Sequence, residues 1–142
     1  MGKNVNVCII DDDDIYQFTM SMTLETFTGV DKIIALYDGA EALDYMLDHL
    51  NKEEELPDII FLDINMPIMN GFETISWLNE HKPEIKTITL SMDDDEETII
   101  KMLKAGSKGY LLKDIHPETL NLALNQVIER GHYYTDNVTT AL

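Results

Sequence analysis

Three things are scarce in this chain of 142 residues: cysteine, arginine and long apolar runs. Cys8 is the single cysteine, which excludes an internal disulfide and makes a cytoplasmic location the simplest interpretation. No apolar run approaches the ~18 residues that span a bilayer. The first ten residues, MGKNVNVCII, lack the long apolar core and the cleavage site of a signal peptide. These absences argue against a membrane-spanning or disulfide-stabilised protein.

Positive charge is also scarce. Ten Lys and Arg stand against 27 Asp and Glu, for a net charge of −17, and Arg130 is the only arginine. Nucleic-acid backbones and anionic membranes are bound by clusters of basic side chains. The composition therefore excludes direct nucleic-acid or membrane-surface binding by this segment, and it favours a divalent cation or a basic partner. The hydrophobic fraction of 44% is ordinary for one globular domain.

Short apolar runs alternate with longer segments of helical spacing. Strands are predicted over 5–10, 32–36, 58–63, 86–91 and 108–112, and helices over 14–27, 39–51, 70–82, 93–106 and 116–131. Several runs are apolar on consecutive residues, which is typical of parallel strands covered on both faces. The pattern predicts one doubly wound α/β sheet. The acidic segment 51–57 is predicted to be a solvated loop.

Polar side chains stand at the carboxyl ends of four predicted strands. Asp11 and Asp12 follow the first run, Asp63 ends the third, Ser91 ends the fourth and Lys113 follows the fifth. In a parallel sheet these ends meet at one edge, where doubly wound proteins bind their ligands. We therefore expect the five side chains to form a site.

The chemistry of this set favours phosphoryl transfer. Crowded carboxylates raise one another's pKa values unless a cation neutralises them, and Mg²⁺ suits such a group. A lysine and a hydroxyl bind phosphoryl oxygens, and a carboxylate can serve as the nucleophile. An acidic pair such as Asp11 and Asp12 is also typical of a helix N-cap, but Asp63 and Lys113 on the same edge favour a site. The next aspartates, 13 and 14, are predicted to start the first helix.

Four motifs resemble those of response-regulator receiver domains. They are IIDDDD at 9–14, an Asp-x-x-Met-Pro-x-x-x-Gly signature within IFLDINMPIMNG at 60–71, TLSM at 89–92 and GYLLKD at 109–114. Together they cover the chain from about residue 5 to residue 130 at receiver-like spacing. The resemblance implies a flavodoxin-like (βα)5 fold with a five-stranded parallel sheet in the order 2-1-3-4-5.

The resemblance also implies a role for each residue of the metal site. Asp63 is the phospho-acceptor and a metal ligand. Asp12 binds Mg²⁺ directly, Asp11 binds it through a coordinated water, and the third protein ligand is the backbone carbonyl of Asn65.

Further roles follow from the same resemblance. Ser91 and Lys113 each bind a phosphoryl oxygen, and Tyr110 is the aromatic residue whose rotamer, together with Ser91, couples to phosphorylation. Asn65 and Asp93 occupy positions that tune the lifetime of the phosphoryl group.

Two residues depart from the usual receiver pattern. Met92 stands where a small residue is common, so we expect it either to narrow access to Asp63 or to alter the inward swing of Tyr110. Asp114 stands where many receivers have proline, which rules out a cis X-Pro bond at that point.

The tail, ERGHYYTDNVTTAL, resembles the linker that joins receiver and output domains in LuxR/FixJ-type (NarL-like) regulators. We therefore expect residues 1–130 to form the receiver and residues 131–142 to begin a linker to an absent output domain.

These features predict a signalling switch rather than an enzyme. A sensor histidine kinase would phosphorylate Asp63, and the only chemistry of the chain itself would be self-catalysed phosphotransfer and slow autodephosphorylation. The predicted partners are that kinase, the protein's own C-terminal DNA-binding domain and a second copy in a homodimer. Three alternatives remain open: a stand-alone receiver, a small aspartyl-nucleophile phosphatase and, least favoured, a Ca²⁺ binder, because no Asp-x-Asp-x-Asp-Gly loop is present.

Overall fold

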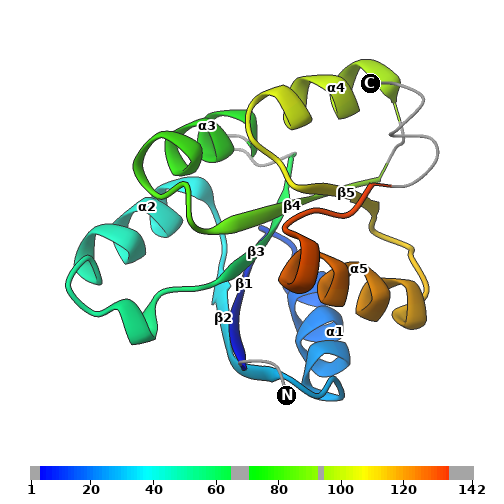
Figure 1. The fold of residues 1–142 in the computed structure, drawn as a ribbon, viewed down its shortest axis with the longest axis horizontal. Coiled ribbons are helices and arrows are strands. Elements are labelled where there is room, and N and C mark those ends of the chain that lie inside the picture. The colour runs from blue at the N-terminus through cyan, green and yellow to red at the C-terminus, as the bar shows by residue number, and fades with distance from the viewer. Residues whose placement is uncertain (1–3, 65–70, 93–94, 135–142) are drawn as a thin grey trace.

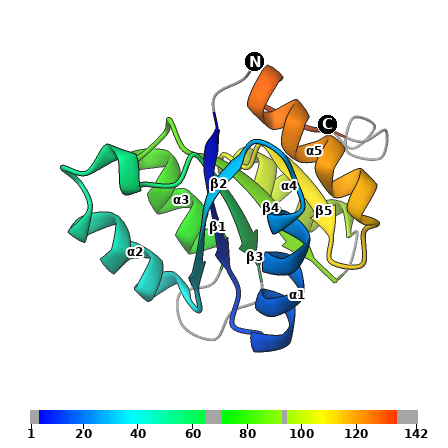
Figure 2. The same ribbon diagram turned by 90° about the horizontal axis from the view of Figure 1, so that it is seen from below.

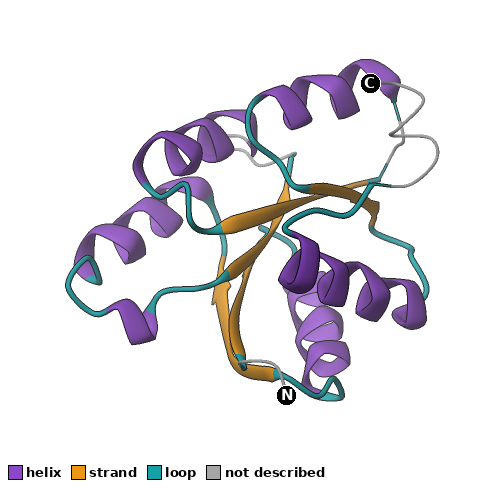
Figure 3. Ribbon diagram, viewed as in Figure 1, coloured by secondary structure: helices purple, strands orange, loops and turns teal. Residues whose placement is uncertain are grey.

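The computed structural model describes residues 4–64, 71–92 and 95–134. Five parallel strands form one sheet in the order β2-β1-β3-β4-β5, as predicted. The strands and helices alternate along the chain (Figures 1 and 3). The strands are β1 (Val5–Ile10), β2 (Val30–Leu36), β3 (Ile59–Asp63), β4 (Lys86–Ser91) and β5 (Gly109–Leu112). The helices are α1 (Asp14–Glu25), α2 (Gly39–Asp48), α3 (Gly71–His81), α4 (Glu96–Lys104) and α5 (Pro117–Arg130).

The sheet is covered by helices on both faces. All residues of β1 and β3 are buried, as expected for strands that are apolar on consecutive positions. Alternate β1 residues enter two different cores: Val7 and Ile9 pack with α1 and α5, whereas Cys8 and Ile10 pack with α2, α3 and α4. Figure 2 shows α1 and α5 on one side of the sheet and α2 and α3 on the other.

Aspartates start three of the helices. Asp13 caps α1, where its carboxylate accepts hydrogen bonds from the backbone N–H groups of Ile15 and Tyr16. Asp38 and Asp95 cap α2 and α4 in the same way. These carboxylates accept hydrogen bonds from backbone N–H groups that have no partner within the helix. Their negative charge also interacts favourably with the positive end of the helix dipole. Part of the acidic character of the chain is therefore used to start helices, as predicted for Asp13.

Several predicted boundaries differ from the observed ones. The helix predicted over 39–51 ends at Asp48, and the strand predicted to begin at residue 32 begins at Val30. The segment 51–57 is not simply a solvated loop: Glu53–Glu55 form a turn of 3₁₀ helix. Leu56 is buried in the core beside α2 and α3, so its apolar side chain holds the end of this segment against the domain. Within the described ranges, no helix has the length and apolarity needed to cross a bilayer.

The strand order creates the position of the site. The chain moves outward from β1 to β2, then crosses back to β3 on the other side of β1. The carboxyl ends of β1 and β3 are therefore neighbours at the point where the direction of winding reverses, which is where doubly wound sheets bind ligands. Asp11 and Asp12 follow β1, and Asp63 is the last residue of β3.

The thiol of Cys8 gives a test of the core. Cys8 is fully buried, and burial raises the pKa of its thiol above the ordinary value of 9.0. A raised folded-state pKa contributes stability that is complete below pH 9 and is lost as the pH rises, at about 1.4 kcal/mol per pH unit. Cys8→Ala should lower the free energy of unfolding by about 1 kcal/mol at pH 7. It should nevertheless become the more stable protein above about pH 10. Urea unfolding from pH 7 to pH 11 tests this, and parallel curves for the two proteins would contradict it.

Candidate metal and phosphoryl site

Four strand ends bring polar side chains to one edge of the sheet. Backbone hydrogen bonds continue beyond the strands at this edge: the N–H of Asp11 donates to Leu36 O at 3.0 Å, and the N–H of Lys113 donates to Ser91 O at 2.8 Å. The residues just after β1 and β5 thus continue the backbone hydrogen bonding of the strands. This geometry places Asp11, Asp12, Asp63, Ser91 and Lys113 on the edge that the sequence predicted.

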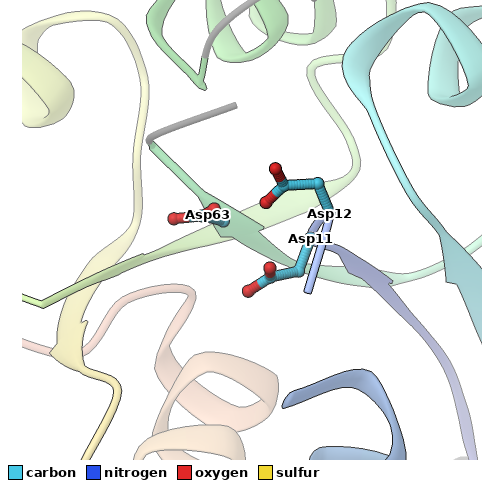
Figure 4. A group of neighbouring side chains, drawn as sticks. All are labelled: Asp11, Asp12 and Asp63. Carbon is cyan, nitrogen blue, oxygen red and sulfur yellow. The ribbon is translucent and has the colours of Figure 1, made fainter. Parts of the chain in front are cut away.

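Three carboxylates converge at this edge. Asp11, Asp12 and Asp63 each offer an oxygen within 4.8 Å of the others, and Figure 4 shows them directed toward one region from β1 and β3. Asp11 is fully buried, Asp63 is 3% exposed and Asp12 is exposed. The group therefore has two buried members and one member that faces solvent.

Lys113 lies among these carboxylates. Its Nζ is 2.6 Å from Oδ2 of Asp11 and 3.6 Å from Oδ1 of Asp63, and the lysine side chain is only 12% exposed. Burial by itself lowers the pKa of Lys113, but its contact with Asp11 and the negative charge of Asp63 outweigh burial and raise that pKa. Lys113 is consequently a fixed positive charge, and one ammonium against three carboxylates leaves the cluster negative.

The residues fit a divalent cation. Two oxygens bound to the same Mg²⁺ lie at most about 4.2 Å apart, so carboxylates within 4.8 Å need only small movements to share one ion. Asp11 is already engaged on both oxygens, because Oδ1 accepts from the N–H of Asp13 at 2.9 Å and Oδ2 pairs with Lys113. Asp12 and Asp63 are better placed to bind a metal directly, and Asp11 suits contact through water.

Ser91 and Tyr110 lie on the β4–β5 side of the site. Both are buried, Ser91 at 2% exposed and Tyr110 at 4%. Tyr110 forms a small cluster with Ile99 and Leu103 of α4. The inward position of Tyr110 therefore links β5 to the packing of α4.

The predictions for Asn65, Asp93 and Met92 are not tested by the structure. Asn65 and Asp93 lie outside the described residues, so their predicted roles stay predictions. Met92 is 72% exposed, and it does not belong to the buried cluster around Tyr110. A bulky residue is accommodated after Ser91 because its side chain extends into solvent.

The sequence analysis did not single out Tyr16, which lies in the segment predicted to form the first helix. The Lys113 Nζ lies 4.7 Å from the centroid of the Tyr16 ring, a cation–π contact that completes the surroundings of the ammonium. Burial, and then the negative charges of Asp11 and Asp63, raise the pKa of the Tyr16 phenol. Tyr16 therefore remains neutral beside the site.

Gly71 brings α3 against the end of β3. A Cβ at this position would lie 2.4 Å from the Cα of Ile64 and 2.9 Å from the carbonyl oxygen of Asp63. Its N–H donates to Ile64 O at 3.2 Å. Only glycine permits this approach, so Gly71, the single glycine of the 60–71 motif, brings the backbone of α3 close to Asp63.

The chain matches a known protein family over most of its length. The family model of the response regulator receiver domain matches residues 7–125. Among curated relatives, the oxygen regulatory protein NreC of Staphylococcus epidermidis is 34% identical over 97% of this chain and 61% of its own length. The nitrate/nitrite response regulator protein NarL of Escherichia coli is 47% identical over 61% of this chain and 40% of its own length.

A solved structure agrees with the fold. A LuxR-family two-component response regulator from Aurantimonas sp. superposes with a TM-score of 0.83 at 19% identity, covering 98% of this chain and 95% of that one. The chain spans less than two thirds of the length of the curated relatives NreC and NarL.

Proposed function

Because the chain belongs to the response regulator receiver domain family, on the NarL-like branch, we propose that Asp63 accepts a phosphoryl group from a phosphohistidine. A carboxylate oxygen of Asp63 attacks phosphorus, an O–P bond forms, the P–N bond breaks and the imidazole leaves. Slow hydrolysis returns the carboxylate and releases inorganic phosphate. The observation that carries this proposal is the buried Asp63 within reach of two further carboxylates and the Lys113 ammonium.

Each neighbour of Asp63 has a distinct task in this proposal. A Mg²⁺ ion held by Asp12, Asp63 and the Asn65 carbonyl, with Asp11 acting through water, would neutralise charge on the phosphoryl oxygens. Lys113 moves from its 3.6 Å contact with Asp63 to a phosphoryl oxygen, and its raised pKa keeps it charged while it does so. Its pairing with Asp11 supports this, because that pair holds the ammonium beside Asp63.

The signal would leave the site through Ser91 and Tyr110. The Ser91 hydroxyl binds a phosphoryl oxygen, and Tyr110 repacks against α4. The buried cluster of Tyr110 with Ile99 and Leu103 supports this path, since a change in the Tyr110 rotamer must disturb α4. The lifetime roles of Asn65 and Asp93 belong to the same proposal.

The proposed setting is a two-component pathway in the cytoplasm. A sensor histidine kinase supplies the phosphoryl group, and residues 1–130 act as the receiver. In a longer protein, residues 131–142 would lead to a DNA-binding output domain. The greater length of NreC and NarL supports such an extension, and homodimerisation through the receiver is part of the proposal.

The test uses intact mass spectrometry. With acetyl phosphate and Mg²⁺, the wild-type chain should gain the mass of one phosphoryl group, and a chelator should prevent the gain. The adduct should be labile to hydroxylamine, as an acyl phosphate is. A chain that stays unmodified with donor and Mg²⁺ in excess would reject the proposal. Continuous turnover of a free phosphate ester without a stable adduct would instead favour the phosphatase alternative.

A further inference from the structure

One buried amide lies directly behind the metal-binding aspartates. Gln17, in the first turn of α1, is 2% exposed. Its Nε2 lies 2.8 Å from Leu36 O, 2.9 Å from Ile9 O and 3.1 Å from Asp11 O. An amide nitrogen has two N–H groups, so the three carbonyls share these donors. A single side chain thus joins α1 to the carboxyl ends of β1 and β2.

These contacts fix the peptide from which both aspartates project. The Asp11 N–H donates to Leu36 O at 3.0 Å, and the Asp11 carbonyl accepts from Gln17. Asp11 is therefore held through both its backbone groups. The carbonyl of Asp11 belongs to the peptide plane that leads into Asp12, so its position sets where the Asp12 side chain starts.

The oxygen of the Gln17 amide is not used, in contrast to its N–H groups. Gln17 Oε1 is buried and has no hydrogen-bond partner among the described residues. Buried polar atoms are nearly always paired, and an unpaired one lowers stability. An apolar side chain of the same length would fill the space without this defect, but the three carbonyls would lose their shared donor.

We propose that Gln17 is a positioning residue for the Mg²⁺ site, because it holds the Asp11–Asp12 backbone in the arrangement that directs both carboxylates toward Asp63. The inference rests on the proposed function, since it concerns the metal that function requires. It adds a residue that touches neither metal nor phosphate and acts only through the backbone.

The test compares Mg²⁺ affinity in Gln17→Met and wild type by isothermal titration calorimetry. Methionine matches the length of glutamine and has no donor. Loss of groups that orient metal ligands typically weakens binding 10- to 100-fold, so we expect the Kd for Mg²⁺ to rise by about tenfold or more. Urea unfolding run in parallel should show that the variant still folds cooperatively.

Ser107→Ala is the matched control. Ser107 is a buried residue near the amino ends of β4 and β5. Its hydroxyl donates to Gly109 O at 2.6 Å, and its oxygen also lies 2.7 Å from Thr89 Oγ1 and 3.3 Å from Thr87 O. That edge is opposite to the aspartates. The control should lose stability and keep its Kd for Mg²⁺ within about twofold of wild type, which separates positioning from general weakening of the sheet.

A folded Gln17→Met with a Kd within about twofold of wild type overturns the inference. If that variant does not fold, Gln17→Asn decides, because it keeps the amide and shortens its reach by one methylene; unchanged affinity there is equally decisive against the inference. Failure of the proposed function is seen in the wild type, as absence of Mg²⁺ binding or of phosphorylation, and in that case both proposals fall. Normal phosphorylation of wild type with unchanged Mg²⁺ affinity in the folded variant removes the Gln17 inference alone.

Discussion

Asp63→Asn should abolish phosphorylation and, without divalent cations, make the protein more stable than wild type. The amide has no nucleophilic carboxylate oxygen. Its neutrality also relieves repulsion with Asp11 and Asp12, both within 4.8 Å, at the loss of a 3.6 Å contact with Lys113. The substitution removes two repulsions and one attraction. The repulsion with Asp12 counts for less because Asp12 is exposed, so we expect the free energy of unfolding at pH 7 to rise by about 1 kcal/mol.

The sign should reverse when Mg²⁺ is added. An ion at a hundred times its Kd stabilises the wild type by about 2.7 kcal/mol, and the variant, which lacks one ligand, gains less. Urea unfolding with and without Mg²⁺ measures both effects, and intact mass measures the adduct. Asp44→Asn is the control, because Asp44 is exposed on α2 and its loss should change stability by less than about 0.5 kcal/mol. A phosphorylated Asp63→Asn, or one less stable than wild type without metal, contradicts the prediction.

Lys113→Met should have the second largest effect. The substitution leaves Asp11 fully buried without the ammonium that lies 2.6 Å away. Breaking a buried pair from one side costs about 3–5 kcal/mol, and we expect about 3 kcal/mol because Lys113 retains some exposure. Phosphorylation by a small donor should slow by about 10²- to 10³-fold, as when one oxyanion donor is lost.

The pH dependence of that loss has a definite sign. Because the pKa of Lys113 is raised, its stabilising contribution is complete below the ordinary value of 10.5 and is lost only at higher pH. The difference in unfolding free energy between wild type and Lys113→Met should thus be constant from about pH 7 to pH 10 and shrink above that range.

A double mutant shows whether the pair is responsible. Lys113→Met combined with Asp11→Asn should be less destabilised than the sum of the two single variants, because the second change removes the charge that the first left unpaired. Strict additivity would contradict the assignment. Lys52→Met is the control, because Lys52 is exposed and does not belong to the cluster around Asp11. It should change stability by less than about 0.5 kcal/mol.

The fold class could be predicted from the sequence because buried strands leave a local pattern of consecutive apolar residues. Apolar runs such as residues 5–10 and 59–62 indicated strands covered on both faces, and β1 and β3 are buried throughout. The strand order came from the resemblance of the motifs, not from periodicity. Helix ends were less certain: the helix predicted to run to residue 51 ends at Asp48, where the N–H of His49 donates to Met46 O, a contact that periodicity does not record.

The sequence by itself determined which residues meet at the edge of the sheet. Parallel strands share the direction of their carboxyl ends, so polar residues at those ends, Asp11, Asp63 and Lys113 among them, must lie on one side. Tertiary structure alone decided how they pair: Lys113 lies closer to Asp11 than to Asp63, with the ring of Tyr16 beside it and Gln17 behind the aspartates. These distances depend on how α1 and β5 pack across the sheet. No local pattern encodes them, because the partners are brought together only by folding.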